Sequence, residues 1–216
     1  WYNHWLKDED NGVIERPFLT YYVMGEDRWR FSDQWPLADT EYTRWYLDHS
    51  SGANSLSGDG VLTLRKPDEN KKDRFTYDPG NPVPSLGGHT CCTGSDTEAG
   101  GYDQTQIEMR RDVLVYTSST LKKGIEVTGL LKANLFVTSS ARDTDFTVKL
   151  VDVYPDGKAF NVQEGVIRMR YRDSLRREDL IKPGEIYEIE IDLNATSNYF
   201  AKGHKIRIEV SSSNFP

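Results

Sequence analysis

Short apolar stretches rich in β-branched and aromatic residues recur along the chain, separated by polar residues, glycine and proline. Each stretch has the length and composition of a β-strand. The predicted strands cover residues 17–24, 27–32, 41–47, 60–65, 112–117, 125–138, 145–154, 165–172, 186–193 and 205–211. Turn-forming residues lie between them, as in the Pro-Asp-Gly run 155–157 and the Lys-Pro-Gly run 182–184. Many short strands with almost no helix predict an all-β fold, a β-sandwich or jelly roll.

Two segments depart from this strand pattern. Trp1, Trp5 and Leu6 have the spacing of an amphipathic helix, but so short a helix is marginal by itself, so we expect it to pack on a neighbouring unit. The segment 70–102 is rich in Gly, Pro, Ser, Asp and Lys. A connection of that length without regular structure is more often a functional loop than an idle one.

Charged and apolar residues alternate in two of the predicted strands, 165–172 and 186–193. A two-residue period places each charged set on one face of its strand. If the two strands pair antiparallel, the charges form a cross-strand ladder of opposite sign, which we favour over an anion-binding arginine face. The arginines are Arg168, Arg170 and Arg172, and the acidic residues are Glu188, Glu190 and Asp192.

The composition is that of a globular domain, with 37% hydrophobic and 28% charged residues among 216. The formal net charge of -7 excludes a protein that binds nucleic acid by neutralising its phosphates, and it makes an anionic membrane surface an equally poor partner. The longest apolar runs are far shorter than the ~20 residues of a membrane-spanning helix. Cys91 and Cys92 are adjacent, so they provide no disulfide framework.

The sequence lacks the common catalytic and cofactor motifs. No serine lies in the Gly-x-Ser-x-Gly pattern of a hydrolase nucleophile, and no glycine-rich stretch matches a phosphate-binding motif. The histidines have no metal-ligand spacing, and we interpret His204 as a turn residue bonded to backbone and His49 as part of an exposed turn. Asp143 and Asp145 are few carboxylates for a calcium ion, so a turn cap is favoured there. We therefore predict no catalytic residue, no metal and no cofactor in this chain.

All five tryptophans lie in the first 45 residues. Such rings are more often core or interface anchors, although β-sandwich carbohydrate binders stack sugars on exposed ones. A stand-alone carbohydrate-binding or adhesive module is therefore the alternative function. The tryptophans are Trp1, Trp5, Trp29, Trp35 and Trp45.

Motifs spread over nearly the whole chain resemble one family. They include Trp5-Leu-Lys-Asp-Glu-Asp-Asn-Gly-Val, Tyr77-Asp-Pro-Gly-Asn-Pro-Val-Pro followed by Gly87-Gly88, and Ser211-Ser-Ser-Asn-Phe-Pro. Further ones are Tyr22-Val-Met-Gly, Trp29-Arg, Tyr102-Asp-Gln, Arg111-Asp-Val-Leu-Val-Tyr, Thr144-Asp-Phe-Thr-Val-Lys-Leu-Val-Asp-Val-Tyr-Pro-Asp-Gly, Arg168-Met-Arg-Tyr-Arg and Gly203-His-Lys-Ile-Arg. Together they resemble the C-terminal jelly-roll domain of the cocaine esterase and X-Pro dipeptidyl-peptidase group of serine hydrolases (the CocE/NonD family), which includes the α-amino-acid ester hydrolases.

The resemblance implies that an α/β-hydrolase domain with the Ser, Asp and His of a catalytic triad precedes a galactose-binding-like jelly roll. On this basis residues 1–16 are the tail of the hydrolase domain or a linker, and residues 17–216 are the jelly roll, truncated at its C-terminus. The chain would be non-catalytic and would pack on the hydrolase domain of the same polypeptide. The substrate of the parent would be a small acyl ester or a short X-Pro peptide.

The resemblance also implies which residues face that substrate. In the family the loop from Pro-Val-Pro to Gly-Gly approaches the active site, and the residues after it would line the acyl side of the pocket. The implied wall consists of Gly87, Gly88, His89, Thr90, Cys91 and Cys92. The alternative is a surface turn with two inert thiols. An apolar face without its partner domain would favour association of copies, so a homo-oligomer is a further expectation.

Overall fold

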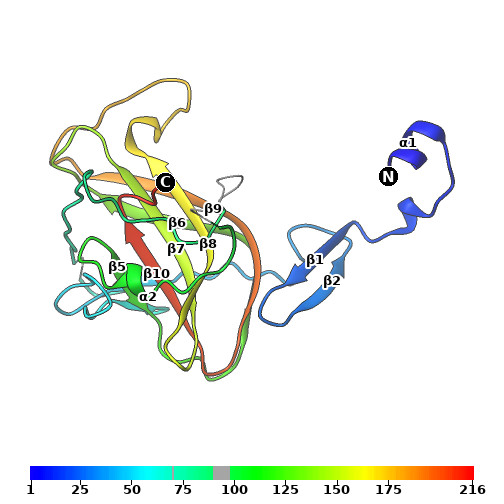
Figure 1. The fold of residues 1–216 in the computed structure, drawn as a ribbon, viewed down its shortest axis with the longest axis horizontal. Helices are drawn as coiled ribbons and strands as arrows, with labels where there is room; N and C mark the ends of the chain where they lie inside the picture. The colour runs from blue at the N-terminus through cyan, green and yellow to red at the C-terminus, as the bar shows by residue number, and fades with distance from the viewer. Residues whose placement is uncertain (70, 90–97) are drawn as a thin grey trace.

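The computed structural model describes residues 1–69, 71–89 and 98–216. Within these residues strands dominate, which confirms the all-β prediction (Figure 1). The helical elements are α1 (Tyr2–Lys7) and α2 (Thr105–Glu108) and the 3-10 turns η1 (Val13–Glu15) and η2 (Met169–Tyr171). The strands are β1 (Leu19–Val23), β2 (Arg28–Ser32), β3 (Tyr46–Asp48), β4 (Val61–Thr63), β5 (Leu114–Thr117), β6 (Ile125–Val137), β7 (Asp145–Val153), β8 (Ala159–Arg168), β9 (Tyr187–Phe200) and β10 (Lys205–Ser211).

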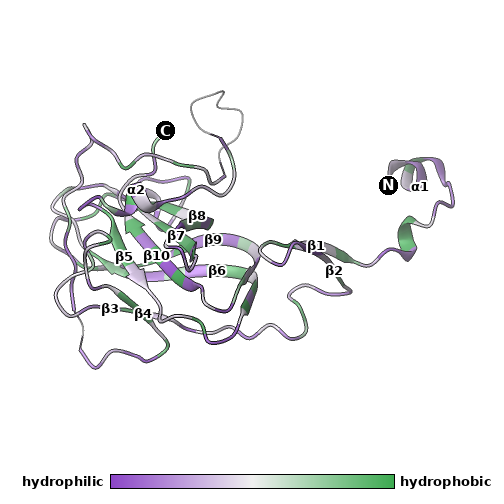
Figure 2. Ribbon diagram, turned by 60° about the horizontal axis from the view of Figure 1, so that its bottom comes forward, coloured by the Kyte–Doolittle hydropathy of each residue, from purple (hydrophilic) through white to green (hydrophobic). Residues whose placement is uncertain are grey.

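Two sheets face each other across the main hydrophobic core. One has six strands in the order β3-β4-β5-β10-β7-β8, and the other is the long antiparallel ribbon β6-β9. Side chains from both fill the space between them, among them Phe146 and Ile206 from the first sheet and Ile191 and Phe200 from the ribbon. Figure 2 shows apolar, green segments in β5 and β7 within this body. The arrangement is a β-sandwich.

The two sheets differ in how many of their faces are covered. β7 is buried along almost its whole length, whereas β9 alternates between exposed and buried residues from Glu188 to Leu193. The six-stranded sheet has a second, smaller apolar cluster on its outer face near α2, which includes Val83, Ile107 and Val113. The outer face of the ribbon lies in solvent, so the alternation predicted for its acidic strand is confirmed.

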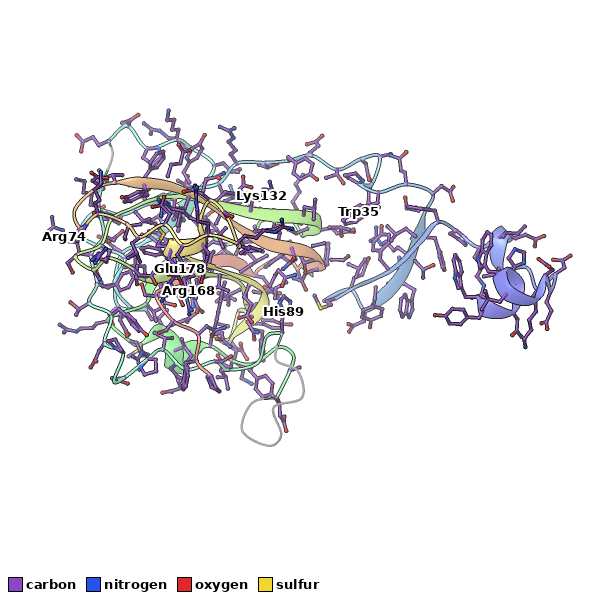
Figure 3. The ribbon with its side chains drawn as sticks, turned by 90° about the horizontal axis from the view of Figure 1, so that it is seen from above. Trp35, Arg74, His89, Lys132, Arg168 and Glu178 are labelled. Carbon is purple, nitrogen blue, oxygen red and sulfur yellow. The ribbon has the colours of Figure 1, made fainter. Side chains whose placement is uncertain are left out.

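Residues 1–36 form an arm that extends away from the sandwich (Figures 1 and 3). It comprises α1, η1 and the hairpin β1-β2, which is a two-stranded sheet of its own. A single bridge joins the hairpin end to β9: Met24 N–H donates to Ser197 O at 3.0 Å, and Tyr199 N–H donates to Met24 O at 2.8 Å. The next residue is Gly25, and only glycine fits there because a Cβ would lie 2.5 Å from the Tyr199 carbonyl oxygen. Arg30 of β2 adds an ion pair with Glu126 of β6 at 2.9 Å, so the contacts of the arm gather at this end of the ribbon.

The predicted N-terminal helix is present as α1, and none of its residues is buried. The long irregular segment is also confirmed, since the described residues between β4 and α2 contain neither helix nor strand. None of the helices in the described ranges is long and apolar enough to span a bilayer.

The strand predicted over 165–172 has the wrong bounds. β8 begins six residues earlier, at Ala159, and ends at Arg168, after which the chain enters η2. The three arginines therefore do not alternate along one strand, because only Arg168 lies in β8. Arg170 and Arg172 lie in or after the 3-10 turn and bind acidic side chains of the surrounding loops. The partners are Asp145 for Arg168, Asp143 and Glu178 for Arg170, and Asp179 for Arg172.

The predicted ladder between the arginine strand and the acidic strand is also wrong. β9 pairs with β6, and Glu190 forms an ion pair with Lys132 at 2.7 Å across that ribbon. Figure 3 shows Lys132 on the ribbon and Arg168 apart from it. The acidic face of β9 is a solvated surface whose cation comes from β6.

Candidate functional site

The long loop closes on itself at the Gly-Gly motif. Gly88 N–H donates to Gly100 O at 2.8 Å, and Gly100 N–H donates back to Gly88 O at 3.1 Å. Gly87 and Gly88 have φ of 72° and 83°, a region that glycine adopts without steric cost. The two glycines therefore let the chain turn at the base of the loop, next to His89. Of the implied wall residues, Thr90, Cys91 and Cys92 lie outside the described residues.

Glu164 of β8 supports this turn from the sheet. Its Oε1 accepts from His89 N–H at 3.2 Å, and its Oε2 accepts from the Asn214 side-chain amide at 3.1 Å. Gly88 packs so closely on the same carboxylate that a Cβ would overlap its oxygens. Figure 3 places His89 on the side of the sandwich nearest the arm. Sequence reasoning missed Glu164 because the predicted strand began one residue after it.

Asn161, also on β8, fastens the far end of the loop. Its Oδ1 accepts from Tyr102 N–H at 2.7 Å, and its amide donates to Gly100 O at 3.2 Å. Gln104 is fully buried and donates to Asn161 Oδ1 at 3.2 Å and to Leu86 O at 2.9 Å. Both ends of the loop are therefore bound to β8, the near end through the Glu164 carboxylate and the far end through the Asn161 amide.

Charged side chains are buried beneath this amide network. Lys149 Nζ donates to Gln104 Oε1 at 3.1 Å, and Arg207 donates to Glu108 of α2 at 2.5 Å. Burial raises the pKa of Glu209 to about 8, with Lys149 lowering it and Glu108 raising it further. The raised pKa favours the protonated form of Glu209, which lies beside the buried ion pair that holds α2 to the sheet.

Two histidines lie in other surroundings than the sequence predicted. His204 Nδ1 lies 2.9 Å from Asp152 Oδ1 rather than on a backbone group, and burial raises the pKa of Asp152. His49 is nearly buried, with Nε2 3.4 Å from Asp73 Oδ2, rather than exposed. Both predictions are wrong because each imidazole lies beside a buried aspartate, with a hydrogen bond for His204 and a close approach without one for His49. In the described residues no serine or cysteine hydrogen-bonds to either histidine, so no catalytic triad forms around them.

The carboxylates considered for calcium are engaged by arginines. Asp145 accepts from two nitrogens of Arg168 at 2.9 and 3.0 Å, and Asp143 accepts from Arg170 Nε at 2.6 Å and from its backbone N–H at 2.9 Å. These bonds occupy the oxygens that a cation would need. Within the described ranges no group of three or more His, Cys, Asp or Glu side chains is placed to hold a metal ion.

The tryptophans divide between body and arm. Trp45 packs against the main core, whereas Trp1, Trp5 and Trp29 are exposed, and Trp35 is 37% exposed (Figure 3). A cleft of about 970 Å³ elsewhere on the sandwich is lined by Arg74, and neither Gly87, Gly88 nor His89 lines it.

The fold and the loop network define an all-β domain that braces a loop and, within the described residues, lacks a nucleophile–histidine pair. The chain belongs to the X-Pro dipeptidyl-peptidase C-terminal non-catalytic domain family, whose model matches residues 11–216. It is 48% identical to cocaine esterase from Rhodococcus sp. over 211 residues, which are 98% of this chain and 36% of that protein. The resemblance inferred from the motifs is confirmed.

Solved structures share this fold. An aminopeptidase from a marine sediment archaeon, Thaumarchaeota archaeon, has a TM-score of 0.80 and 28% identity, covering 100% of this chain and 35% of that one. An α-amino acid ester hydrolase shares the fold, with a TM-score of 0.78 and 24% identity over 93% of this chain and 34% of that one. The chain spans about a third of the length of these relatives.

Proposed function

We propose that this chain packs against the α/β-hydrolase domain of an acyl hydrolase on the same polypeptide, and that its Gly87-Gly88-His89 turn lines one side of the substrate pocket. The family description, a non-catalytic C-terminal domain, supports the first part. The relatives are about three times as long as this chain, which leaves room in each for a catalytic domain.

The observation that carries the proposal is the uncovered aromatic face of the hairpin. Tyr22 lies opposite Trp29, and Thr20 lies opposite Phe31, so these side chains share one face. The Tyr22 and Trp29 rings meet edge to face at 5.3 Å. Trp29 is 60% exposed and Phe31 63% exposed. A contiguous aromatic face of this kind is typical of a surface that another domain covers.

The proposed chemistry is that of a serine hydrolase. A serine of the catalytic domain attacks the carbonyl of a small acyl ester or a short X-Pro peptide, an acyl-enzyme forms, and water hydrolyses it. The residues of this chain contribute the shape of the acyl pocket rather than proton transfer. Cys91 and Cys92 follow the braced turn, and two small side chains there would favour a wide acyl pocket.

Covalent labelling tests whether a catalytic domain accompanies this chain. The full-length gene product is treated with a fluorophosphonate probe, and its mass is measured by intact mass spectrometry. We expect a labelled species much heavier than 24.7 kDa, with the adduct upstream of Trp1. An unlabelled natural product of 24.7 kDa would contradict the proposal.

The packing itself is tested by placing charge on the aromatic face. Phe31→Asp should lower the melting temperature of the full polypeptide and leave that of residues 1–216 alone unchanged. Equal effects in both would show that the face needs no cover from another domain.

Titration of residues 1–216 with sugars tests the carbohydrate-binding alternative. A saturable tryptophan fluorescence change that is lost in Trp29→Ala would support that alternative instead.

A further inference from the structure

The Glu164 carboxylate connects three segments that are distant in the sequence. It belongs to β8, it accepts the His89 backbone N–H at 3.2 Å, and it accepts the Asn214 amide at 3.1 Å. Each carboxylate oxygen thus serves a different donor. Among the described residues, no Lys, Arg or His side chain forms an ion pair with Glu164. Its carboxylate accepts hydrogen bonds from neutral N–H groups instead.

The contact with Gly88 is steric as well as polar. The three atoms nearest to a Cβ built on Gly88 all belong to the Glu164 carboxylate, and the φ of Gly88 is 83°. Any larger residue at position 88 would therefore be strained by its backbone and blocked by the carboxylate. The Gly88 backbone is packed directly on the Glu164 side chain.

Asn214 shows that the carboxylate also holds the C-terminal motif. The Oδ1 of Asn214 is buried without a hydrogen-bond partner, while its amide group faces Glu164. The next residue pairs with the start of the long loop, since Phe215 N–H donates to Val83 O at 2.9 Å. Glu164 therefore lies where the Gly-Gly turn, β8 and the C-terminal segment meet.

We propose that Glu164 is a positioning residue: its carboxylate fixes the backbone of Gly88 and His89 and so sets the shape of the pocket wall. The reason for an acid at this site is that a carboxylate offers only acceptors and forms stronger bonds to N–H groups than a neutral amide does. The inference has two steps: Glu164 fixes the turn, and the fixed turn shapes the pocket wall. Only the second step rests on the proposed function.

Hydrogen exchange of residues 1–216 and of the full polypeptide tests the first step. In Glu164→Ala the amides of Gly88, His89 and Gly100 should exchange about tenfold faster or more, because a charge-assisted bond and its packing are lost. Glu164→Gln retains one acceptor and should give an intermediate rate. The matched control is Glu188→Ala on the exposed face of β9, which should leave these amides unchanged. Equal exchange in wild type and Glu164→Ala would overturn the inference.

Steady-state kinetics of the full polypeptide test the second step. With p-nitrophenyl acetate and p-nitrophenyl butyrate as probes, Glu164→Ala should raise KM severalfold with a smaller change in kcat, and the factor should differ between the two acyl groups. Glu164→Gln should recover most of the loss, which a merely misfolded variant would not allow.

The two failures are distinguishable. If the turn loosens but KM for both esters is unchanged, Glu164 does not position a pocket wall, and the wall assignment of the proposed function is overturned with it. If fluorophosphonate labels no catalytic domain, the proposed function fails, whereas the exchange rates still decide whether Glu164 holds the turn.

Discussion

The arm and the ribbon use the same kind of residue in opposite ways. On β9 the apolar residues face the six-stranded sheet, and Phe200 is 0% exposed. On the β1-β2 hairpin the aromatic residues face outward, and Phe31 is 63% exposed. A two-stranded sheet cannot cover its own face, whereas a ribbon laid on six strands is covered along its length. Residue type therefore sets strand formation in both regions, and the presence of a second layer sets burial.

The largest difference in the free energy of unfolding is expected between two variants, one that replaces a buried phenylalanine by alanine and one that replaces an exposed phenylalanine. Phe200→Ala removes a fully buried ring from the main core and should lower the free energy of unfolding by about 3–5 kcal/mol. Phe31→Ala in the arm should change it by less than about 0.5 kcal/mol in the isolated chain. Urea unfolding of both variants measures the difference. Equal losses would mean that the arm is covered in solution, for example by a second copy.

The next effect contrasts two ion pairs. Arg207→Met leaves Glu108 buried without its cation and should cost about 3 kcal/mol. Lys132→Met breaks the exposed pair with Glu190 and should cost less than about 1 kcal/mol. Denaturant midpoints at low and high salt separate them, because only the exposed pair is screened by salt. A small loss in Arg207→Met would mean that the buried ion pair contributes little to stability.

The third effect depends on pH. Because the pKa of Glu209 is raised from 4.5 to about 8, the folded chain holds a proton in this interval that the unfolded chain releases. Its contribution to stability is fully present below pH 4.5 and is lost as the pH rises towards 8, with a slope of at most about 1.4 kcal/mol per pH unit. Glu209→Gln should abolish this slope in urea titrations between these pH values. An unchanged slope would assign the proton to another group.

The arm responds to pH in the opposite direction. A bond from Arg30 holds the pKa of Glu26 below its ordinary value, so the contribution of this pair is present above that value and is lost as the pH falls. The loss at low pH is shared with the sandwich, where hydrogen bonds also lower the pKa of Asp59 and Glu178, whereas the loss on rising pH is assigned to Glu209 of the sandwich.

The smallest effect on global stability is expected at the junction of arm and body. Gly25→Ala would press a methyl group on the Tyr199 carbonyl at a φ of 76°, which should break the Met24 bridge. We expect faster hydrogen exchange at the Met24 and Tyr199 amides and a change in the free energy of unfolding of less than about 0.5 kcal/mol. A loss as large as that of Phe200→Ala would mean that arm and sandwich unfold together.

Much of the fold could be predicted from the sequence because strand periodicity is local. β6, β7 and β10 appear within one residue of their predicted bounds. The start of β8 was missed because Asn161 and Glu164 interrupt the apolar pattern, and these are the residues that bind the long loop. Their polar side chains are explained by partners that are 59 and 75 residues away, which no local pattern contains.

The candidate site shows the same division. Gly87 and Gly88 were identified by the resemblance, and their backbone conformation explains the choice of glycine. The histidine predictions failed because His204 and His49 are placed by Asp152 and Asp73, whose burial depends on the assembled sandwich. Likewise the arginine ladder failed because the acidic strand β9 pairs with β6, while Arg168 binds Asp145 of its neighbouring strand β7.

The Met24 bridge bears on where this protein can be cut. A boundary drawn where contacts are sparse would fall after β2 and leave the sandwich as the minimal unit. Such a cut would deprive Ser197 O and Tyr199 N–H, on the outer edge of β9, of their partners and so lengthen the unpaired part of that edge. Expression boundaries for the sandwich should therefore lie upstream of Met24, and a version trimmed past it should be more prone to self-association.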